Sequence, residues 1–320
     1  MQKEWLTYVV KEAEDGRVLR SVMRGGMKLS GRMLQKLTRS DGFRVNGKKT
    51  FLNQKVQAGD QITICIAEEE QSTVAPVEMP LQIAYEDAHV LVLNKPPGIE
   101  VHPPEQRAKF RPTLAHGVAY YFEQIGLQAK VRPLHRLDKD TTGLVVFVKS
   151  AFAHQALDRQ LRKGGIKRTY LAIVHGTPAE QAGTITGPIA RDPDRPMLRC
   201  VAEGGEEAIT HYRVIQSFRE PNSDKPCALL ALRLETGRTH QIRVHLRYQG
   251  WPIFGDDDYG GYAESIDRQA LHAASVHFAH VETGQPVEVK AALPEDMARL
   301  LPETIGPEGF DEWVAEWRSK

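Results

Sequence analysis

Arg132-Pro-Leu-His-Arg-Leu-Asp-Lys-Asp-Thr-Thr-Gly-Leu-Val-Val-Phe-Val-Lys149 is the stretch that determines the fold. Its second half, residues 144–148, is an unbroken apolar and β-branched run, typical of a strand buried on both faces. Its first half is charged and ends in Thr-Thr-Gly. A charged loop that leads into a buried strand places polar groups at the edge of a rigid core, where active sites are commonly built. The plainer alternative is a turn in which Asp138 or Asp140 only caps the backbone.

The amino-acid sequence of this loop also resembles a family signature. His135-Arg136-Leu137-Asp138, followed by Thr141-Thr142-Gly143-Leu144, is similar to the signature of RluA-type pseudouridine synthases, which isomerise uridine to pseudouridine in structured RNA. The resemblance implies that Asp138 is the catalytic residue and that Arg136 enters the space left by a flipped-out base. His135 is a candidate for substrate binding or, like Lys139 and Asp140, a support of the loop.

A second charged segment, Gly237-Arg-Thr-His-Gln-Ile-Arg-Val-His245, follows a predicted strand over residues 230–234. The pattern predicts a helix with Thr239 as its N-cap and Gly250 at its end. The segment resembles a motif of the same family in which the arginine after isoleucine, here Arg243, pairs with the catalytic aspartate. By the same resemblance, Arg238 and His240 are candidates for substrate binding.

Lys167-Arg-Thr-Tyr-Leu-Ala-Ile-Val-His-Gly176 reads as an internal strand. It resembles a family motif whose tyrosine packs against the target uracil, which implies that role for Tyr170; a core tyrosine is the alternative. Residues 85–103 are similar to the family's opening segment. Two positions depart from the family pattern: Glu206-Glu207 stands where a lysine is common, and Val281 stands where a proline is usual.

Basic residues dominate the segment 17–55, which contains a single acid, Asp41. A helix is predicted over residues 29–37 with Ser30 as N-cap, an apolar face, and basic residues on the opposite side. Strands are expected at 43–45, 54–56 and 62–66, with a hairpin turn at Asn46-Gly47. Most of residues 14–67 resembles the small RNA-binding domain first described in ribosomal protein S-four; a basic, solvated surface on an accessory domain is the alternative. The candidate RNA contacts are Arg32, Lys36, Arg39 and Arg44.

The predicted architecture is a two-domain α+β protein. The resemblance implies a mixed, largely antiparallel sheet flanked by helices, preceded by a small α/β RNA-binding domain. The expected boundaries are an S-four-like domain at 1–70, a linker without apolar periodicity at 71–80, a catalytic domain at 81–298 and a tail at 299–320 with a short helix at 308–318.

Composition excludes several other classes. No apolar run approaches the ~20 residues that span a bilayer, the N-terminus lacks the apolar core of a signal peptide, and three scattered cysteines suit a reducing cytoplasm. A metal hydrolase using His240, His245 and the acids 256–258 is disfavoured, because a five-residue spacing places the two imidazoles on different helix faces. The acid triplet is interpreted as a solvated, glycine-rich turn.

The sequence therefore predicts a pseudouridine synthase that acts as a monomer on ribosomal RNA, with transfer RNA as the alternative. The isomerisation involves no redox change and no departing group, so we expect neither cofactor nor metal. Asp138 would act on the ribose as nucleophile or as base. The rival interpretation is a non-catalytic RNA-binding or ribosome-assembly factor that retains the fold.

Overall fold

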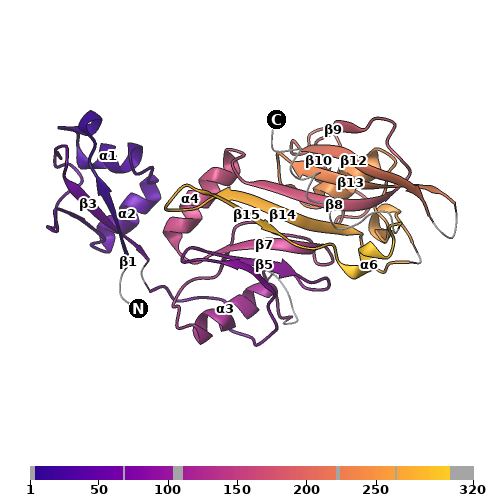
Figure 1. Cartoon of the computed structure of the whole chain (residues 1–320), viewed down its shortest axis with the longest axis horizontal. Helices are drawn as coiled ribbons and strands as arrows, with labels where there is room; N and C mark the ends of the chain where they lie inside the picture. Colours follow the sequence, from indigo (N-terminus) through magenta and orange to yellow (C-terminus); the bar gives the residue numbers. More distant parts are fainter. Residues whose placement is uncertain (1–3, 68, 104–110, 221–223, 264, 303–320) are drawn as a thin grey trace.

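The structure is a computed structural model that describes residues 4–67, 69–103, 111–220, 224–263 and 265–302. Figure 1 shows a small N-terminal unit beside a larger, elongated unit built on one twisted sheet. We refer to residues 4–67 as the N-terminal unit and to residues 83–302 as the main unit. The largest hydrophobic clusters of the two units are distinct, although the N-terminal cluster also includes Phe152 of the main unit.

The N-terminal unit packs two helices against a three-stranded antiparallel sheet of order β1-β3-β2. The predicted helix is present, and the Ser30 hydroxyl caps it by accepting a hydrogen bond from the Met33 amide at 3.1 Å. The elements of this unit are β1 (Glu4–Val9), the 3-10 helix η1 (Glu12–Glu14), α1 (Leu19–Gly25), α2 (Gly31–Arg39), β2 (Phe43–Val45) and β3 (Gln61–Ala67).

The main unit is organised around a ten-stranded sheet in which the path β4-β5-β7-β14-β8-β13-β12-β9 is extended by β15 on β14 and β6 on β7. The pair β7–β14 is parallel and the other pairs of this sheet are antiparallel, as the sequence predicts for a mixed, largely antiparallel sheet. A separate antiparallel pair is formed by β10 and β11. The strands are β4 (Ile83–Glu86), β5 (Val90–Lys95), β6 (Arg132–Pro133), β7 (Thr142–Val148), β8 (Lys167–His175), β9 (Ala182–Thr186), β10 (Ile189–Arg191), β11 (Arg199–Val201), β12 (Ile209–Arg219), β13 (Pro226–Leu234), β14 (Leu271–Ala279) and β15 (Pro286–Lys290).

Strand β7 is buried along its whole length, as its composition predicts. Its side chains alternate between two cores: Val145 and Phe147 belong to one hydrophobic cluster, and Leu144, Val146 and Val148 belong to another. Both faces of the strand are therefore covered. The helices of this unit are α3 (Leu114–Gln124), α4 (Ala151–Arg162), α5 (Gln241–Tyr248), the 3-10 helix η2 (Asp257–Tyr259) and α6 (Glu295–Ala298).

Two local predictions are wrong. The segment 54–56 is not a strand of the sheet, because the carbonyls of Gln54 and Val56 accept hydrogen bonds from the chain just before and at the start of α1. Helix α5 is capped by His240 in a left-handed conformation, with a φ of 56°, and not by Thr239. The helix predicted at 308–318 lies outside the described residues, and the domain boundaries stay a prediction. Among the described residues no helix is long and apolar enough to cross a membrane.

Candidate active site

Asp138 lies in the loop between β6 and β7, where the fold keeps it close to solvent. Its neighbour Leu137 is buried in the main core, and on its other side Thr141 is buried at the start of the strand. The Asp138 side chain itself keeps 17 % of its surface exposed. Rigid packing on both sides thus fixes the backbone of Asp138 while its carboxylate remains accessible.

The conformation of Gly143 explains why the Thr-Thr-Gly sequence after this loop ends in glycine. Gly143 has a φ of +107°, and a Cβ atom added there would lie 2.3 Å from the carbonyl oxygen of Ala273. Gly143 and Ala273 are in register in the parallel pair β7–β14. A residue with a side chain cannot approach the neighbouring strand this closely, so glycine is required for the loop to join the sheet at this point.

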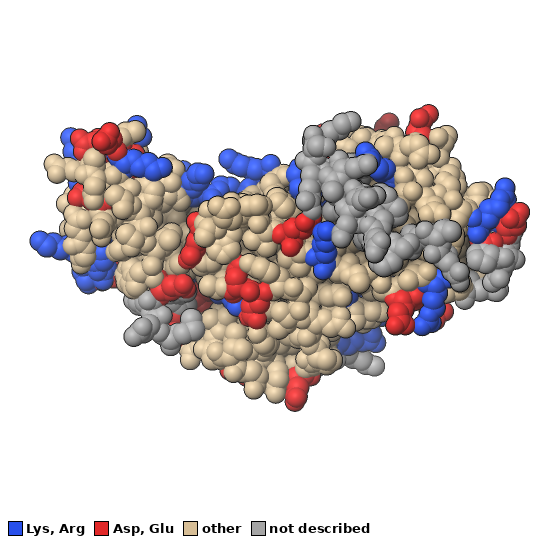
Figure 2. Space-filling model, viewed as in Figure 1, with Lys and Arg blue, Asp and Glu red and all other residues tan. Residues whose placement is uncertain are grey.

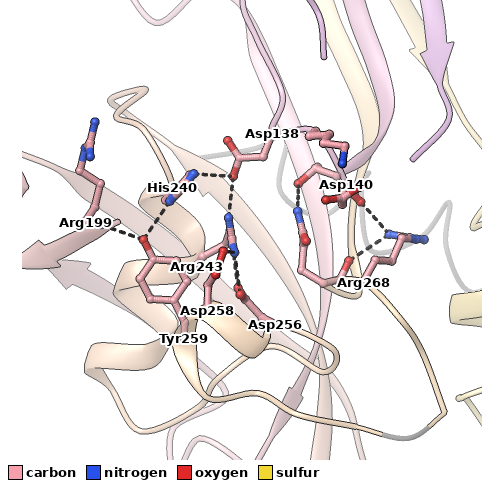
Figure 3. A network of polar contacts seen from close by, with 12 residues as sticks. Asp138, Asp140, Arg199, His240, Arg243, Asp256, Asp258, Tyr259 and Arg268 are labelled. Carbon is pink, nitrogen blue, oxygen red and sulfur yellow. Dashed lines mark hydrogen bonds and ion pairs between the residues drawn. The ribbon is translucent and has the colours of Figure 1, made fainter. Parts of the chain in front are cut away.

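Arg243 connects Asp138 to a set of acidic side chains (Figure 3). Its Nη1 atom lies 3.6 Å from Asp138 Oδ2. Its strongest contacts are to Asp256, with Nε and Nη2 each donating to a different carboxylate oxygen at 2.7 Å, and Nη2 also donates to Asp258 at 2.9 Å. The predicted pairing of Arg243 with Asp138 is therefore present, but Asp256 is the closer partner.

The charge on this arginine is secured by its partners. Arg243 is only 7 % exposed and Asp256 is fully buried. Burial opposes the charged guanidinium, yet the hydrogen bonds and charge of Asp256, the charge of Asp138 and the hydrogen bond to Asp258 together raise the pKa of Arg243. A permanent cation therefore lies beside the carboxylate of Asp138.

His240 and Tyr259 complete the wall of the site. The Nε2 atom of His240 lies 4.0 Å from Asp138 Oδ2, and its Nδ1 lies 2.9 Å from the Tyr259 hydroxyl. The Tyr259 hydroxyl also accepts a hydrogen bond from the Arg199 amide, and its ring lies 4.9 Å beneath the guanidinium carbon of Arg243. Burial lowers the pKa of His240, with the charge of Asp138 acting in the opposite direction, and burial raises the pKa of Tyr259 to about 12.

The positive φ of His240 is a local strain of the kind that tertiary contacts sustain at functional sites. The Gln241 side chain holds the chain in this conformation. Its Oε1 accepts hydrogen bonds from the Arg238 amide at 2.9 Å and the Thr236 hydroxyl at 2.8 Å, and its Nε2 donates to Thr210 at 3.1 Å.

Lys95 supports the Asp138 loop from the interior of the protein. It is 1 % exposed, and its Nζ donates to the carbonyl oxygens of Pro96, Ile99 and Lys139 at 2.9, 2.9 and 2.7 Å. Burial lowers the pKa of Lys95 to about 7, against the opposing charges of Asp140 and Asp138. The buried side chain thus joins the turn after β5 to the turn that follows Asp138.

Asp140 and its neighbours support the same loop. The Asp140 side chain accepts a hydrogen bond from the Gly98 amide at 3.1 Å, and the backbone carbonyl of Asp140 accepts one from the Arg268 side chain at 3.4 Å. Gln269 donates to the Thr141 hydroxyl at 3.1 Å. These contacts agree with the interpretation of Asp140 as a support, whereas Lys139 contributes its backbone carbonyl and its own side chain is exposed.

Tyr170 is 4 % exposed and belongs to the same hydrophobic cluster as Leu137. It is in register with Ala273 on β14, which is in register with Gly143 on β7. Two strand spacings of about 4.8 Å therefore separate Tyr170 from the strand that follows Asp138. Tyr170 lies in one row of the sheet with the end of the Asp138 loop.

The other predicted substrate-binding residues have different surroundings. Arg136 is exposed. The pKa of His102 is lowered mainly by the burial of His102 and, to a smaller extent, by the charge of Arg136. His135 is partly buried; its Nε2 accepts a hydrogen bond from the Val146 amide at 3.4 Å, and burial followed by the charge of Arg168 lowers its pKa to about 3. His135 is therefore a neutral support of β7. Arg238 lies at the rim, paired with Glu206 at 2.7 Å, so the acid pair that departs from the family pattern has a partner here.

The four candidate RNA contacts all lie on the N-terminal unit (Figure 2 shows its Lys and Arg side chains in blue). Arg32, Lys36 and Arg39 line a shallow cavity of about 320 Å³ along α2. Arg39 also borders a second cavity of about 330 Å³ between α1 and α2. Lys36 pairs with Glu70, and Arg44 pairs with Asp41 and stacks 5.5 Å above the ring of Trp5.

The sequence interpretation missed Asp256, Tyr259 and Lys95. Asp256 was expected in a solvated turn, but its carboxylate is fully buried against Arg243. The apolar run Trp251-Pro-Ile-Phe254, separated from Asp256 only by Gly255, is the signal that could have indicated burial. In the part of the chain that the structure describes, no group of three or more His, Cys, Asp or Glu side chains is placed to hold a metal ion.

The chain is similar to proteins of known family and to solved structures. The profile of the RNA pseudouridylate synthase family matches residues 89–248, a segment that includes Asp138 and Arg243. An uncharacterized RNA pseudouridine synthase of Bacillus subtilis is 42% identical over 295 residues, which is 92% of this chain and 96% of the relative. The ribosomal large subunit pseudouridine synthase D of Vibrio cholerae is 39% identical over 260 residues, 77% of this chain and 78% of the relative. The solved structure of human RNA pseudouridylate synthase domain containing 1 has 25% identity and a TM-score of 0.59, and the likeness covers 78% of this chain and 98% of that one.

Proposed function

The chain belongs to the RNA pseudouridylate synthase family, a family of isomerases, and we propose that Asp138 is the catalytic residue with which it converts uridines of ribosomal RNA to pseudouridine. The observation that carries this proposal is the placement of the Asp138 carboxylate, which is 17 % exposed in the loop before β7 and lies 3.6 Å from Arg243. A carboxylate that is accessible, rigidly held and paired with a cation suits covalent or proton-transfer chemistry.

The reaction requires little beyond such a group. The bond from the ribose carbon C1′ to N1 of uracil breaks, the base turns, and a new bond forms from C1′ to C5. The C5 proton is then lost and N1 gains a proton, so atoms and charge balance without an oxidant or a second substrate. Asp138 acts on the ribose, either as the nucleophile that holds it or as the base that removes a proton from it.

Arg243 orients Asp138. Its Nη1 atom lies 3.6 Å from Asp138 Oδ2, so the guanidinium attracts the carboxylate and holds it in one direction. Asp256 fixes the guanidinium from behind through two hydrogen bonds of 2.7 Å. The pair therefore orients the arginine without occupying the open side of Asp138.

Further side chains are assigned to contacts with the uracil of the target uridine. Tyr170 packs against the detached uracil, and His240, 4.0 Å from Asp138, contacts the substrate from α5. Because a base inside a duplex or loop is inaccessible, it must be flipped out at a cost of a few kcal/mol. Arg136 is exposed, as a side chain that fills the vacated space has to be.

The N-terminal unit is proposed to be an S-four-like domain that binds RNA phosphates through Arg32, Lys36, Arg39 and Arg44. The support is the basic cavity along α2. Ribosomal RNA is proposed as the substrate because several similar proteins, such as that of Vibrio cholerae, are named for the ribosomal large subunit. Asp138, Arg243 and Asp256 meet within one chain, which supports the proposal that the protein acts as a monomer. Ribosomal RNA as the proposed substrate supports the proposal that it acts in the cytoplasm.

Mapping pseudouridine in cells tests the proposal. Pseudouridines are mapped at nucleotide resolution in total RNA from a strain with the gene, a strain without it, and a strain that carries the Asp138→Asn gene. The expected result is the loss of specific ribosomal RNA sites in the second and third strains. Loss confined to transfer RNA would overturn the ribosomal assignment, and no loss in the third strain would overturn the role of Asp138.

A further inference from the structure

We propose that the N-terminal unit is docked in one fixed orientation on the main unit, and that Glu70 is a positioning residue that joins helix α2 to the segment leading into the Asp138 loop. Figure 1 shows α2 and α4 side by side at the junction of the two units. Three sets of contacts, apolar, backbone and ionic, hold this junction.

The apolar core of the N-terminal unit includes side chains of the main unit. Phe152 of α4 is 6 % exposed and belongs to the hydrophobic cluster otherwise formed by residues 10–66. Val281, in the turn after β14, packs against that cluster and also against a cluster of the main unit. Val281 is the residue that departs from the proline usual in the family, and here it contributes an apolar contact between the units.

Helix α4 also holds the backbone at the start of α2. Arg159 Nη1 and Gln155 Nε2 donate to the Lys28 carbonyl at 2.5 and 3.3 Å. The Ser30 amide donates to Gln155 Oε1 at 2.7 Å. Because Ser30 is the N-cap of α2, these contacts fix the beginning of the helix that carries the candidate RNA contacts.

Glu70 forms the ionic part of the junction. Its carboxylate pairs with Lys36 Nζ at 2.9 Å and with Arg132 Nη2 at 2.5 Å. Burial opposes the charged form of Glu70, but the hydrogen bonds and charges of Lys36 and Arg132 together outweigh it and lower the pKa of Glu70. Lys36 lies on α2, whereas Arg132 lies on β6 and opens the stretch that contains Asp138. Glu70 therefore connects the RNA-facing helix with the lead-in to the catalytic loop.

The segment between the units is packed rather than free. The Glu70 amide donates to the Gln128 carbonyl at 2.9 Å, and the Val77 amide donates to the His116 carbonyl at 3.1 Å. Met79 lies so close to α3 that a Cβ atom added to Gly117 would be 2.5 Å from its Cγ. The expected linker at 71–80 is thus partly bound to helix α3.

A docked unit has a consequence for substrate selection, and this step rests on the proposed function. A flexible tether would let the basic helix contact phosphates at many distances from the target uridine. A fixed orientation admits only RNAs whose phosphates match the spacing between α2 and Asp138, and it raises the affinity for those RNAs because less freedom is lost on binding.

A distance measurement tests the docking without any RNA. Phe51→Cys and Met197→Cys place labels on exposed positions of the two units, 79% and 85% exposed, in a Cys200→Ser background; Cys65 and Cys227 are buried. Pulsed electron paramagnetic resonance should give one narrow distance distribution, which broadens when Glu70→Gln and Arg159→Ala are added. A broad distribution before these substitutions would overturn the proposal.

Kinetics test the consequence. Glu70→Gln is compared with Glu78→Gln, an exposed linker glutamate, on a long structured RNA and on a minimal stem-loop with the same uridine. Glu70→Gln should raise KM for the long RNA roughly 3- to 10-fold, leave kcat unchanged, and leave KM for the stem-loop unchanged. An equal KM change on both RNAs, or none on either, would overturn the role of Glu70. If neither RNA is modified by the unsubstituted protein, the proposed function fails while the distance measurement still decides the docking.

Discussion

Replacing Asp256 by asparagine should both destabilise the protein and slow its reaction. The Asp256 side chain is fully buried and accepts two hydrogen bonds of 2.7 Å from Arg243. Asparagine keeps the shape but removes the negative charge and turns an amide group toward the guanidinium. A buried cation is then left without its main counter-charge.

The size of the effect follows from what remains around Arg243. Breaking a buried ion pair from one side costs roughly 3–5 kcal/mol. Asp258 still accepts a hydrogen bond at 2.9 Å, but it is half exposed, and Asp138 is 3.6 Å away. We therefore expect the free energy of unfolding to fall by about 3 kcal/mol. Because Arg243 also orients Asp138, kcat should fall by about 10- to 100-fold.

Two measurements check this prediction, with Asp257→Asn as the control. Asp257 is the exposed neighbour, so the same chemical change there should alter neither quantity. Urea unfolding followed by tryptophan fluorescence gives the free energy, and release of tritium from C5 of labelled uridine gives the rate. If the free energy of unfolding of the Asp256→Asn protein stays within about 0.5 kcal/mol of the unsubstituted value, the scatter of surface substitutions, and kcat is unchanged, Asp256 is not needed to hold Arg243.

Three further substitutions or conditions test other parts of the structure. Gly143→Ala should lower the free energy of unfolding by about 3 kcal/mol in urea titrations, because its Cβ would lie 2.3 Å from the Ala273 carbonyl oxygen; an unchanged midpoint would contradict this. Burial lowers the pKa of His272 to about 4, whereas an unfolded histidine has a pKa of about 6.5. The unfolded chain therefore binds a proton that the folded chain excludes, and His272 alone should lower the free energy of unfolding by about 1.5 kcal/mol between about pH 6.5 and 5. Over the same interval the His272→Gln protein should lose about 1.5 kcal/mol less than the unsubstituted protein. An equal loss in the two proteins would contradict the prediction. Lys95→Met should lower the free energy of unfolding by about 2–4 kcal/mol, because three backbone carbonyls lose their donor. It should also slow turnover, because the Asp138 loop is held less firmly. Thermal unfolding followed by circular dichroism and the tritium assay measure the two effects, and unchanged values would show that the buried amine is dispensable.

Local sequence carried the predictions that depend on neighbours along the chain. The run at 144–148 predicted a strand buried on both faces because its composition admits no exposed face, and β7 is buried throughout. Ser30 predicted the start of α2 because capping is a contact over three residues. The family signature placed Asp138 and Arg243 correctly near one another, 105 residues apart in the chain, and spacing alone could not have done so.

The remaining features depend on residues distant in sequence. The glycine-rich setting of Asp256 predicts a solvated turn, but Arg243 on the distant helix α5 pairs with its carboxylate, which is fully buried. The left-handed conformation of His240 is sustained by Gln241 and Tyr259, so a cap rule based on residue type selected Thr239 instead. The packing of the 71–80 segment on α3 likewise arises from contacts that no local pattern encodes.

We propose that the Asp138 carboxylate performs the isomerisation. A single-turnover reaction of the purified protein with the ribosomal RNA that loses a pseudouridine in the gene-deletion strain tests this role, comparing the unsubstituted protein with Asp138→Asn. We expect pseudouridine from the former and none above background from the latter, with RNA affinity and unfolding midpoint unchanged. An Asp138→Asn protein that forms pseudouridine at the unsubstituted rate would contradict the account.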